Sequence, residues 1–417
     1  MAHWFHRNLF KATVPENFDL KMVALDTEAL KICGDLKQCR KRLLELIPDA
    51  NHSCETIDTV FNSYLSIVQG FLKSFDGDNR ASKMRHSLVF KWTHTLLGNK
   101  PYAEQDFLYE VANMTMNVGI WFMKHASTIA GKDDITMDEA KEVHTSLRKA
   151  AGAFQLATQN MIPELVSHPE PGMDLDPRVA GAYLAQCTAE AQEVTVARAI
   201  ELKHNASLIA ALANETAKLF LDAENLLNTL NVKIVGQWKT YMQLKAAFYT
   251  ACAYMYCGEN CLILEKGGDA IRACQESQKY YDKAMALCKE YAKMKGPAKL
   301  AKPEQHLFFR KLQPVIQRTL EKCERENGFI YHQKVPYDPP LLELKATYGL
   351  VKPEAVAMPE PSPLWNPASY AAFDTAMAAA RDPKSKGKSE GELPEVKEAK
   401  VHQSGSDPKN ESGCVLQ

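Results

Sequence analysis

The last four residues, Cys414-Val415-Leu416-Gln417, are the group whose types and order specify a chemical reaction most directly. A cysteine followed by two aliphatic residues and a terminal glutamine is a CAAX prenylation box, and the glutamine favours a farnesyl group on the thiol. The preceding stretch of Lys, Glu, Ser, Gly and Pro leaves the box accessible to a prenyltransferase. We therefore predict that Cys414 is S-farnesylated and that CAAX-processing enzymes remove the last three residues.

A second group, Asp133, Asp134 and Asp138, carries carboxylates that a divalent metal ion could use on a helical fold. Such sites usually need a second carboxylate cluster facing the first, and none is evident in the sequence. Thr136 and Glu139 explain the pattern better, because their spacing is that of a capping box in which each side chain accepts from the other residue's amide. The group therefore predicts the start of a helix.

Two further patterns give no site. Gly387-Lys388-Ser389 resembles the end of a phosphate-binding loop, but Asp382 stands where the first glycine belongs and no strand precedes it. Cys252, Cys257 and Cys261 lack the CxxC spacing of zinc sites, so we interpret them as buried thiols in a helix seam. The sequence therefore predicts no catalytic residue, no cofactor and no metal.

Composition narrows the class of protein. The 417 residues are 46% hydrophobic and 24% charged, with a formal net charge of −1. This balance is typical of a globular protein and gives no basic stripe for nucleic acid. The first residues lack the apolar core of a signal peptide, and no apolar run is long enough to span a membrane. We expect a cytoplasmic monomer that is partly associated with membranes through its lipid, with its eleven cysteines as free thiols or ligands rather than a disulfide framework.

Apolar residues recur every three to four positions over most of the chain, which predicts a mainly α protein. The segment SLVFKWTHTL is short, aromatic and β-branched, and it predicts a strand; residues 1–24 read as extended or hairpin-like. The predicted helices run from Asp26 or Thr27 to Ile47, Glu55–Leu72, Ala103–Ile129, Thr136–Asn160, Gln237–Leu264, Asp269–Met294 and 303–327, with a turn at Gly267-Gly268.

Residues 185–220 form the centre of the predicted array, as two helices with a break near residues 203–205. The second helix has apolar residues on two adjacent flanks, so its apolar arc is wider than the roughly 100° stripe that docks a surface helix. A wide arc indicates either full burial or a face kept for a partner. One flank carries Leu208, Leu212 and Leu219; the other carries Ile209, Ala213 and Phe220.

The pattern changes at Val335. The following segment is rich in proline but keeps apolar residues, so we expect it to lie extended along the helical body. Residues 382–413 contain almost no large apolar residue and are expected to be disordered. The predicted organisation is a domain at 1–365, a short C-terminal helix at 366–381 and a disordered tail at 382–417 that ends in the CAAX box.

Five stretches of this sequence resemble Bro-one (BRO1) domains, the helical domains of Alix and its relatives in the ESCRT pathway. The resemblance covers about residues 3–365. It implies an elongated, boomerang-shaped domain of tetratricopeptide-like helical hairpins, with a small β-element near the N-terminus. The matching stretches are AEAQEV, LIAALAN, FKWTHTL, KEVHTSLRKAAGAF and NGFIYHQKVP.

The resemblance also implies a groove that binds the C-terminal amphipathic helix of ESCRT-III subunits, chiefly the Snf-seven-type charged multivesicular body proteins. Residue by residue, it places Lys141, His144, Leu208 and Leu212 in this groove. Some relatives carry a large aromatic residue where this chain has Thr195. On this basis the leucine flank is expected to line the groove rather than the core, so that an aspartate at position 212 would abolish binding and barely change the melting temperature.

We therefore predict a non-enzymatic, ESCRT-associated adaptor that a farnesylated tail tethers to membranes. A second hypothesis is a helical-repeat scaffold that reads an unrelated peptide or a cytoskeletal or nuclear-envelope partner. A third is an enzyme on a helical fold, for which a divalent metal beside Asp133 and Asp134 would be the supporting observation. A binding screen with ESCRT-III tails would distinguish the first two hypotheses, and a bound divalent metal ion would support the third.

Overall fold

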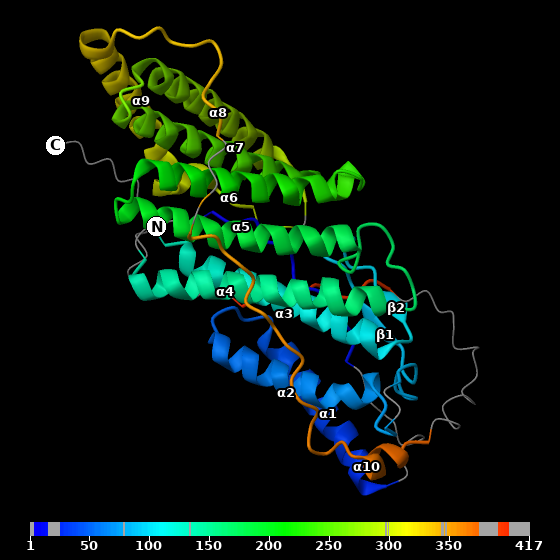
Figure 1. Cartoon of the computed structure of the whole chain (residues 1–417). Helices are drawn as coiled ribbons and strands as arrows, with labels where there is room; N and C mark the ends of the chain where they lie inside the picture. Colours follow the sequence, from blue (N-terminus) through cyan, green and yellow to red (C-terminus); the bar gives the residue numbers. More distant parts are fainter. Residues whose placement is uncertain are drawn as a thin grey trace, which may run out of the picture.

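The structure is a computed structural model that describes residues 4–15, 26–77, 80–132, 135–296, 298, 300–342, 346, 348–374 and 391–399. In this part of the chain, long helices lie side by side in an elongated stack, and successive helices pack against one another (Figure 1). The only strands in the described residues form a two-stranded antiparallel sheet. The prediction of a mainly α, elongated fold with a small β-element is confirmed.

The elements follow one another in a simple order, with short π- and 3₁₀-turns at some helix ends. They are α1 Thr27–Leu46, α2 Cys54–Leu72, β1 Phe90–Trp92, β2 Tyr102–Glu104, α3 Phe107–Ala130, α4 Met137–Leu156, α5 Pro177–Glu201, α6 Ala206–Leu227, α7 Val232–Ile263, α8 Gly267–Lys293, α9 Leu307–Glu326 and α10 Pro367–Ala371.

Polar capping residues fix where the helices begin. The capping box predicted from the sequence is present: the Thr136 hydroxyl accepts from the amide of Glu139, and the Glu139 carboxylate accepts from the amide of Thr136. Asn205 caps α6 by accepting from the amide of Leu208. Lys203 has a φ of 53°, which is the left-handed conformation that ends a helix. The predicted break between the two central helices is therefore confirmed.

The helix predicted to start at Ala103 starts later. Tyr102–Glu104 instead forms β2, which pairs with β1 so that Tyr102 faces Trp92. Helix α3 begins at Phe107, and Asp106 caps it by accepting from the amide of Leu108. Helical spacing does not show that β1 pairs with residues 102–104. The prediction from spacing alone therefore placed the start of the helix four residues too early.

The two glycines at 267 and 268 lie in the first turn of α8, and the turn itself precedes them at Glu265, whose φ is 60°. They are needed for a close approach. A Cβ atom at Gly268 would lie 2.3 Å from the carbonyl oxygen of Lys334, and one at Gly267 would lie 2.5 Å from Oδ1 of Asn327. The predicted role of these glycines as the turn is therefore wrong.

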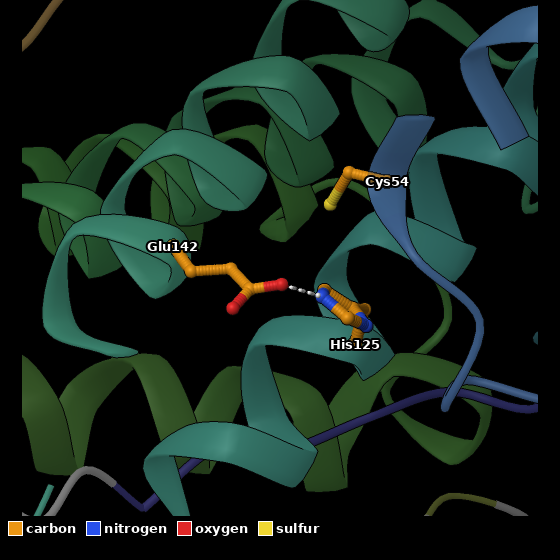
Figure 2. Close-up of side chains that lie close together, drawn as sticks. All are labelled: Cys54, His125 and Glu142. Atoms are coloured by element: carbon orange, nitrogen blue, oxygen red, sulfur yellow. Dashed lines mark hydrogen bonds and ion pairs between the residues drawn. The ribbon is translucent and has the colours of Figure 1, made fainter. Parts of the chain in front are cut away.

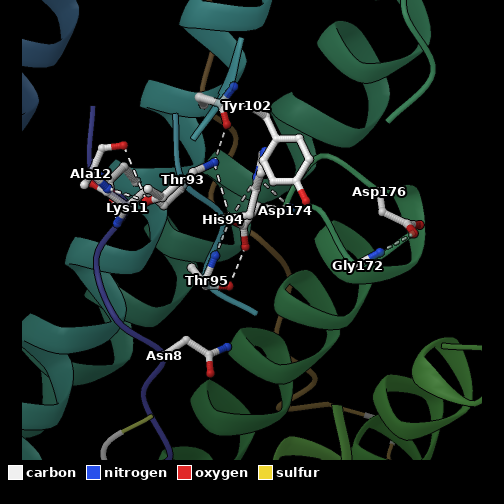
Figure 3. Close-up of polar contacts among 12 residues, drawn as sticks. Asn8, Lys11, Ala12, Thr93, His94, Thr95, Tyr102, Gly172, Asp174 and Asp176 are labelled. Atoms are coloured by element: carbon white, nitrogen blue, oxygen red, sulfur yellow. Dashed lines mark hydrogen bonds and ion pairs between the residues drawn. The ribbon is translucent and has the colours of Figure 1, made fainter. Parts of the chain in front are cut away.

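Residues 4–15, here called the N-terminal arm, run extended between the helices, and most of them up to Ala12 are buried. The arm adds a bridge to the small sheet between Thr13 and Trp92. Its Lys11 ammonium lies 3.5 Å from the buried carboxylate of Asp174, which also accepts from the amide and hydroxyl of Thr95 (Figure 3). Burial alone would raise the pKa of Asp174, but the Lys11 ammonium, followed by hydrogen bonds from His94 and Thr95, lowers it to about 2.

Residues 348–365, here called the crossing segment, lie extended across the helical stack, as predicted for the region after Val335 (Figure 1). The segment meets successive helices in the reverse of their order in the chain. Its contacts are Gln192 Nε2 to the Gly349 carbonyl at 2.7 Å on α5, the Glu354 amide to the Arg148 carbonyl at 3.0 Å on α4, and the Ser362 amide to the Ser66 carbonyl at 3.0 Å on α2.

Part of the predicted disordered tail is docked on the domain. Residues 391–399, here called the tail segment, place Pro394 and Val396 in a hollow beside α1. The Leu393 amide donates to the Asn99 carbonyl, the Ala399 amide donates to the Pro48 carbonyl, and Glu398 pairs with Lys124. The prediction of disorder over 382–417 is therefore wrong for 391–399, because a single proline and a single valine find an apolar hollow that composition cannot reveal.

The predicted short C-terminal helix begins at Pro367, where Asn366 caps α10. This helix ends at Ala371, and residues 375–390 lie outside the described residues, as do residues 400–417 with Cys414. The predicted continuation of this helix over residues 375–381 therefore lies outside the described residues.

Gly152 tests how the crossing segment is held. A Cβ atom at Gly152 would lie 1.8 Å from the carbonyl oxygen of Glu354, so Gly152→Ala must displace backbone. We expect a loss of about 1–3 kcal/mol in the free energy of unfolding, as in overpacked sites, and faster proteolysis near residue 354. Gly34→Ala is the matched control, since Gly34 lies in α1 with nothing within 4 Å of the added atom. The free energy of unfolding of the Gly34→Ala variant should rise by up to ~1 kcal/mol, because alanine has the higher helix propensity. Equal gains in both variants, measured by denaturant unfolding, would contradict this packing.

Candidate functional site

A hollow of about 480 Å³, here called the groove, lies between α4, α5, α6 and the start of the crossing segment. Its size is in the range of ligand-binding clefts, and its floor is mainly apolar. It is lined by Met137, Ala140, Lys141, His144, Thr145, Val194, Thr195, Arg198, Ala199, His204, Leu208, Leu212, Tyr348 and Gly349. The structure thus brings together the four groove residues named from the sequence, which come from two helices more than sixty positions apart.

Lys141 and His144 lie one turn apart on α4. The Lys141 side chain is exposed at the rim, and its ammonium is 3.0 Å from Oδ1 of Asp138. An exposed pair of this kind contributes little to folding, so the ammonium remains available to an incoming carboxylate. Burial, followed by the guanidinium of Arg148, lowers the pKa of His144. The imidazole is therefore neutral at pH 7 and suits an apolar wall.

Leu208 and Leu212 form part of the floor, but they also belong to the core. Leu208 is 7% exposed and Leu212 is 1% exposed, and both lie in the largest apolar cluster of the described residues. The crossing segment explains this burial: a Cβ atom at Gly349 would lie 3.3 Å from the Leu212 side chain. The expectation that this leucine flank is surplus to folding is therefore wrong.

The rim and walls contain residues that the sequence did not single out. Arg198 adds a second cation to the rim, and its guanidinium lies 3.2 Å from the Glu201 carboxylate; His204 also lines the groove. Met137, the first residue of α4, lines the groove and is 41% exposed. In the sequence, only the place of this large apolar residue directly after a capping threonine indicates that it could lie exposed and bind a partner. Thr195 also lines the groove, so no aromatic ring stands at that point of the wall.

Among the other sequence candidates, the three cysteines of α7 are described and do not line the groove. Cys252, Cys257 and Cys261 lie buried on α7, and burial raises the pKa of Cys252 to about 12, which keeps its thiol protonated. Asp133 and Asp134 lie outside the described residues. In the described part of the chain, none of the helices combines the length and the apolar character needed to cross a bilayer.

Comparison with known proteins places these features in context. Residues 24–373 match the family described as BRO1-like domain. The chain is 49% identical over 416 residues to BRO1 domain-containing protein BROX of Danio rerio, covering all of both chains. It is 51% identical over 374 residues to the protein of the same description from Homo sapiens, covering 90% of this chain and 91% of that one. The solved structure of an ALIX BRO1 CHMP4C complex has a TM-score of 0.64 at 19% identity, over 87% of this chain and 99% of that chain.

The burial of Leu212 gives a direct stability prediction. Leu212→Asp places an unpaired carboxylate where the side chain is 1% exposed, and we expect it to lower the free energy of unfolding by about 3 kcal/mol or more. Leu221→Asp is the control on the same helix, because Leu221 is 43% exposed, and its effect should stay within about 0.5 kcal/mol. Chemical denaturation of both variants measures the difference. Similar midpoints for the two would show that Leu212 is not part of the core.

Proposed function

Because this chain belongs to the family of proteins with a BRO1-like domain, we propose that it is a non-enzymatic adaptor that binds the C-terminal amphipathic helix of ESCRT-III subunits. The observation that carries the proposal is the groove itself, which combines an apolar floor with a cationic rim. A surface of this kind takes a helix whose apolar side chains recur at three- and four-residue spacing. The helix's own carboxylates would then lie along the rim.

The two kinds of groove residue have different roles in this proposal. Apolar groove residues with exposed side chains, such as the 41% exposed Met137, are desolvated by the bound helix and therefore set the dissociation rate. Lys141 and Arg198 at the rim attract carboxylates over a longer range and set the association rate and its salt dependence. Leu208 and Leu212 shape the floor and hold the domain together at once.

A solved relative supports the kind of partner that is proposed. The ALIX BRO1 domain in its complex with CHMP4C shares the fold of this chain over nearly the whole domain. The resemblance that places Lys141, His144, Leu208 and Leu212 in a groove names residues that meet in one hollow here. A helical scaffold for an unrelated peptide remains the alternative, and peptide choice in the binding experiment decides between them.

We further propose that the adaptor is held at membranes through a farnesylated Cys414. One lipid chain gives only marginal, reversible membrane binding, so a mixed distribution between cytosol and membrane follows. The docked tail segment limits the reach of the anchor, because Cys414 follows Ala399 by fifteen residues. A chain of that length spans at most ~50 Å. The membrane would therefore lie close to the face of the domain that holds the tail segment.

Met137→Asp tests the groove without disturbing the core. An acidic residue in the first turn of a helix is favourable, so we expect an unchanged melting temperature. The carboxylate would face the apolar side of the bound helix, and the affinity for an ESCRT-III tail peptide should fall at least tenfold, which is about 1.4 kcal/mol. Fluorescence anisotropy with labelled peptides measures this change.

Two comparisons make the groove test decisive. Val166→Asp, an exposed apolar position outside the groove, should bind like the wild type. A shuffled peptide of the same composition should not bind. Equal affinity of the Met137 variant and the wild type would place the binding surface elsewhere. Failure of the wild type to bind any ESCRT-III tail would leave the scaffold alternative.

The lipid proposal has its own test. Protein isolated from cells should carry a farnesyl group on Cys414 and lack the last three residues, as measured by mass spectrometry. Cys414→Ser should lose the membrane-associated fraction while binding the soluble peptide as tightly as the wild type, because the groove is formed by α4, α5, α6 and the start of the crossing segment. An intact, unmodified C-terminus in the cell-derived protein would refute the lipid anchor and leave the groove proposal untouched.

A further inference from the structure

Three side chains with metal-binding atoms converge where α2, α3 and α4 meet (Figure 2). Cys54 is the first residue of α2, His125 lies near the end of α3, and Glu142 lies near the start of α4. One ligand atom from each lies within 4.8 Å of the others. The residues are 71 and 17 positions apart in the chain, so no spacing motif marks them and only the fold brings them together.

The His125 ring is oriented for this role by two contacts. Its Nδ1 lies 2.8 Å from the Ala50 carbonyl oxygen, so Nδ1 carries a proton and donates it to the carbonyl. The ring also stacks on Trp121, with centroids 5.0 Å apart and planes at 13°. A second hydrogen bond that fixes the tautomer and the ring plane is a regular feature of metal-bound histidines. The other nitrogen, Nε2, therefore faces the cluster.

The arrangement differs from that of a nucleophilic cysteine with a catalytic histidine. In such a triad the imidazole accepts from the nucleophile at one nitrogen and donates to the orienting group at the other. Here Nδ1 is occupied by the Ala50 carbonyl, and Glu142 Oε1 lies 2.9 Å from Nε2. The Cys54 thiol points into the same space (Figure 2). The donors thus converge on one point, as ligands around an ion do.

We propose that Cys54, His125 and Glu142 bind one Zn²⁺ ion. A thiolate, an imidazole and a carboxylate form a donor set that suits zinc and disfavours magnesium and calcium, which take oxygen ligands. Bonds of about 2.0–2.3 Å hold tetrahedral donors roughly 3.5 Å apart. The 2.9 Å between His125 Nε2 and Glu142 Oε1 must therefore widen slightly, and the Cys54 sulfur must move closer, to complete the site. The fourth position faces Ser146, whose hydroxyl lies 3.3 Å from the Cys54 sulfur, or solvent.

The surroundings permit entry of the ion. The Glu142 side chain is 46% exposed and Cys54 is partly exposed, so solvent reaches the site from the side of α4. The neighbouring ammonium of Lys149 is paired with the Asp58 carboxylate, which offsets its charge. The Nε2 proton of His125, which is donated to Glu142 in the absence of an ion, and the proton of the Cys54 thiol both pass to solvent on binding, because the raised pKa of His125, about 9, keeps the free ring protonated. The sulfur and Nε2 then bond to the ion, with no change in oxidation state. The bound ion would fasten α4 to α2 and α3.

The test uses the full-length chain after removal of metal with a chelator. Titration with ZnCl₂ in a calorimeter should give one ion per chain, and zinc should raise the melting temperature. Co²⁺ in place of Zn²⁺ should give a thiolate-to-metal charge-transfer band. Cys54→Ser should abolish that band and weaken Zn²⁺ binding at least tenfold.

Matched variants make the result specific to this site. Glu142→Gln changes a largely exposed side chain and should also weaken Zn²⁺ binding at least tenfold, so the test does not depend on the fold of the cysteine variant. Cys39→Ser removes another partly exposed thiol, on α1, and should bind Zn²⁺ like the wild type. No uptake of zinc by the wild type would overturn the proposal. Uptake that survives both Cys54→Ser and Glu142→Gln would overturn it as well.

Discussion

Buried charges on the N-terminal arm are the constraint on which the rest of the helical stack depends. The Arg7 guanidinium lies 2.8 Å from the Glu190 carboxylate of α5, and the Lys11 ammonium lies 3.5 Å from Asp174, with all four side chains almost fully buried. A charge left unpaired in such surroundings is strongly destabilising. The arm and the helices around it therefore stabilise each other, because removing either would leave a buried charge without its partner.

The crossing segment holds α5 by hydrogen bonds from the outside of the stack, as the arm holds it by ion pairs from the inside. Gln192 of α5 binds it twice, by donating to the Gly349 carbonyl and by accepting from the Val351 amide. This bidentate contact places Gly349 over the leucine floor of the groove, where it covers Leu212. The groove is thus a gap left between packed elements rather than a surface added to them, and its shape is fixed before any partner arrives.

The sequence predicts the parts of this fold that depend on local physics. Helical periodicity and capping chemistry located most helices, including the break before Asn205 and the capping box at Thr136. The sequence could not predict contacts between segments that are separated in the chain. The start of β2, the close approach at Gly268, the docking of residues 391–399 and the burial of Leu212 each depend on a partner far away in the chain. The groove residues were named through family resemblance, because nothing local distinguishes a leucine on a floor from one in a core.

The tail segment, the Cys54–His125–Glu142 cluster and the groove are linked by a series of short contacts through the inner helices of the stack. Ala399, the last described residue of the tail, donates to Pro48, and two positions later Ala50 accepts from His125. His125 meets Glu142, whose neighbour in α4 is Lys141 at the groove rim. The series of contacts thus joins the docked tail segment to the rim of the groove, and the proposed metal ion would connect two of its members, His125 and Glu142. If the proposed lipid anchors the tail, the groove is held at the same membrane as its partner, which raises the effective concentration of one for the other.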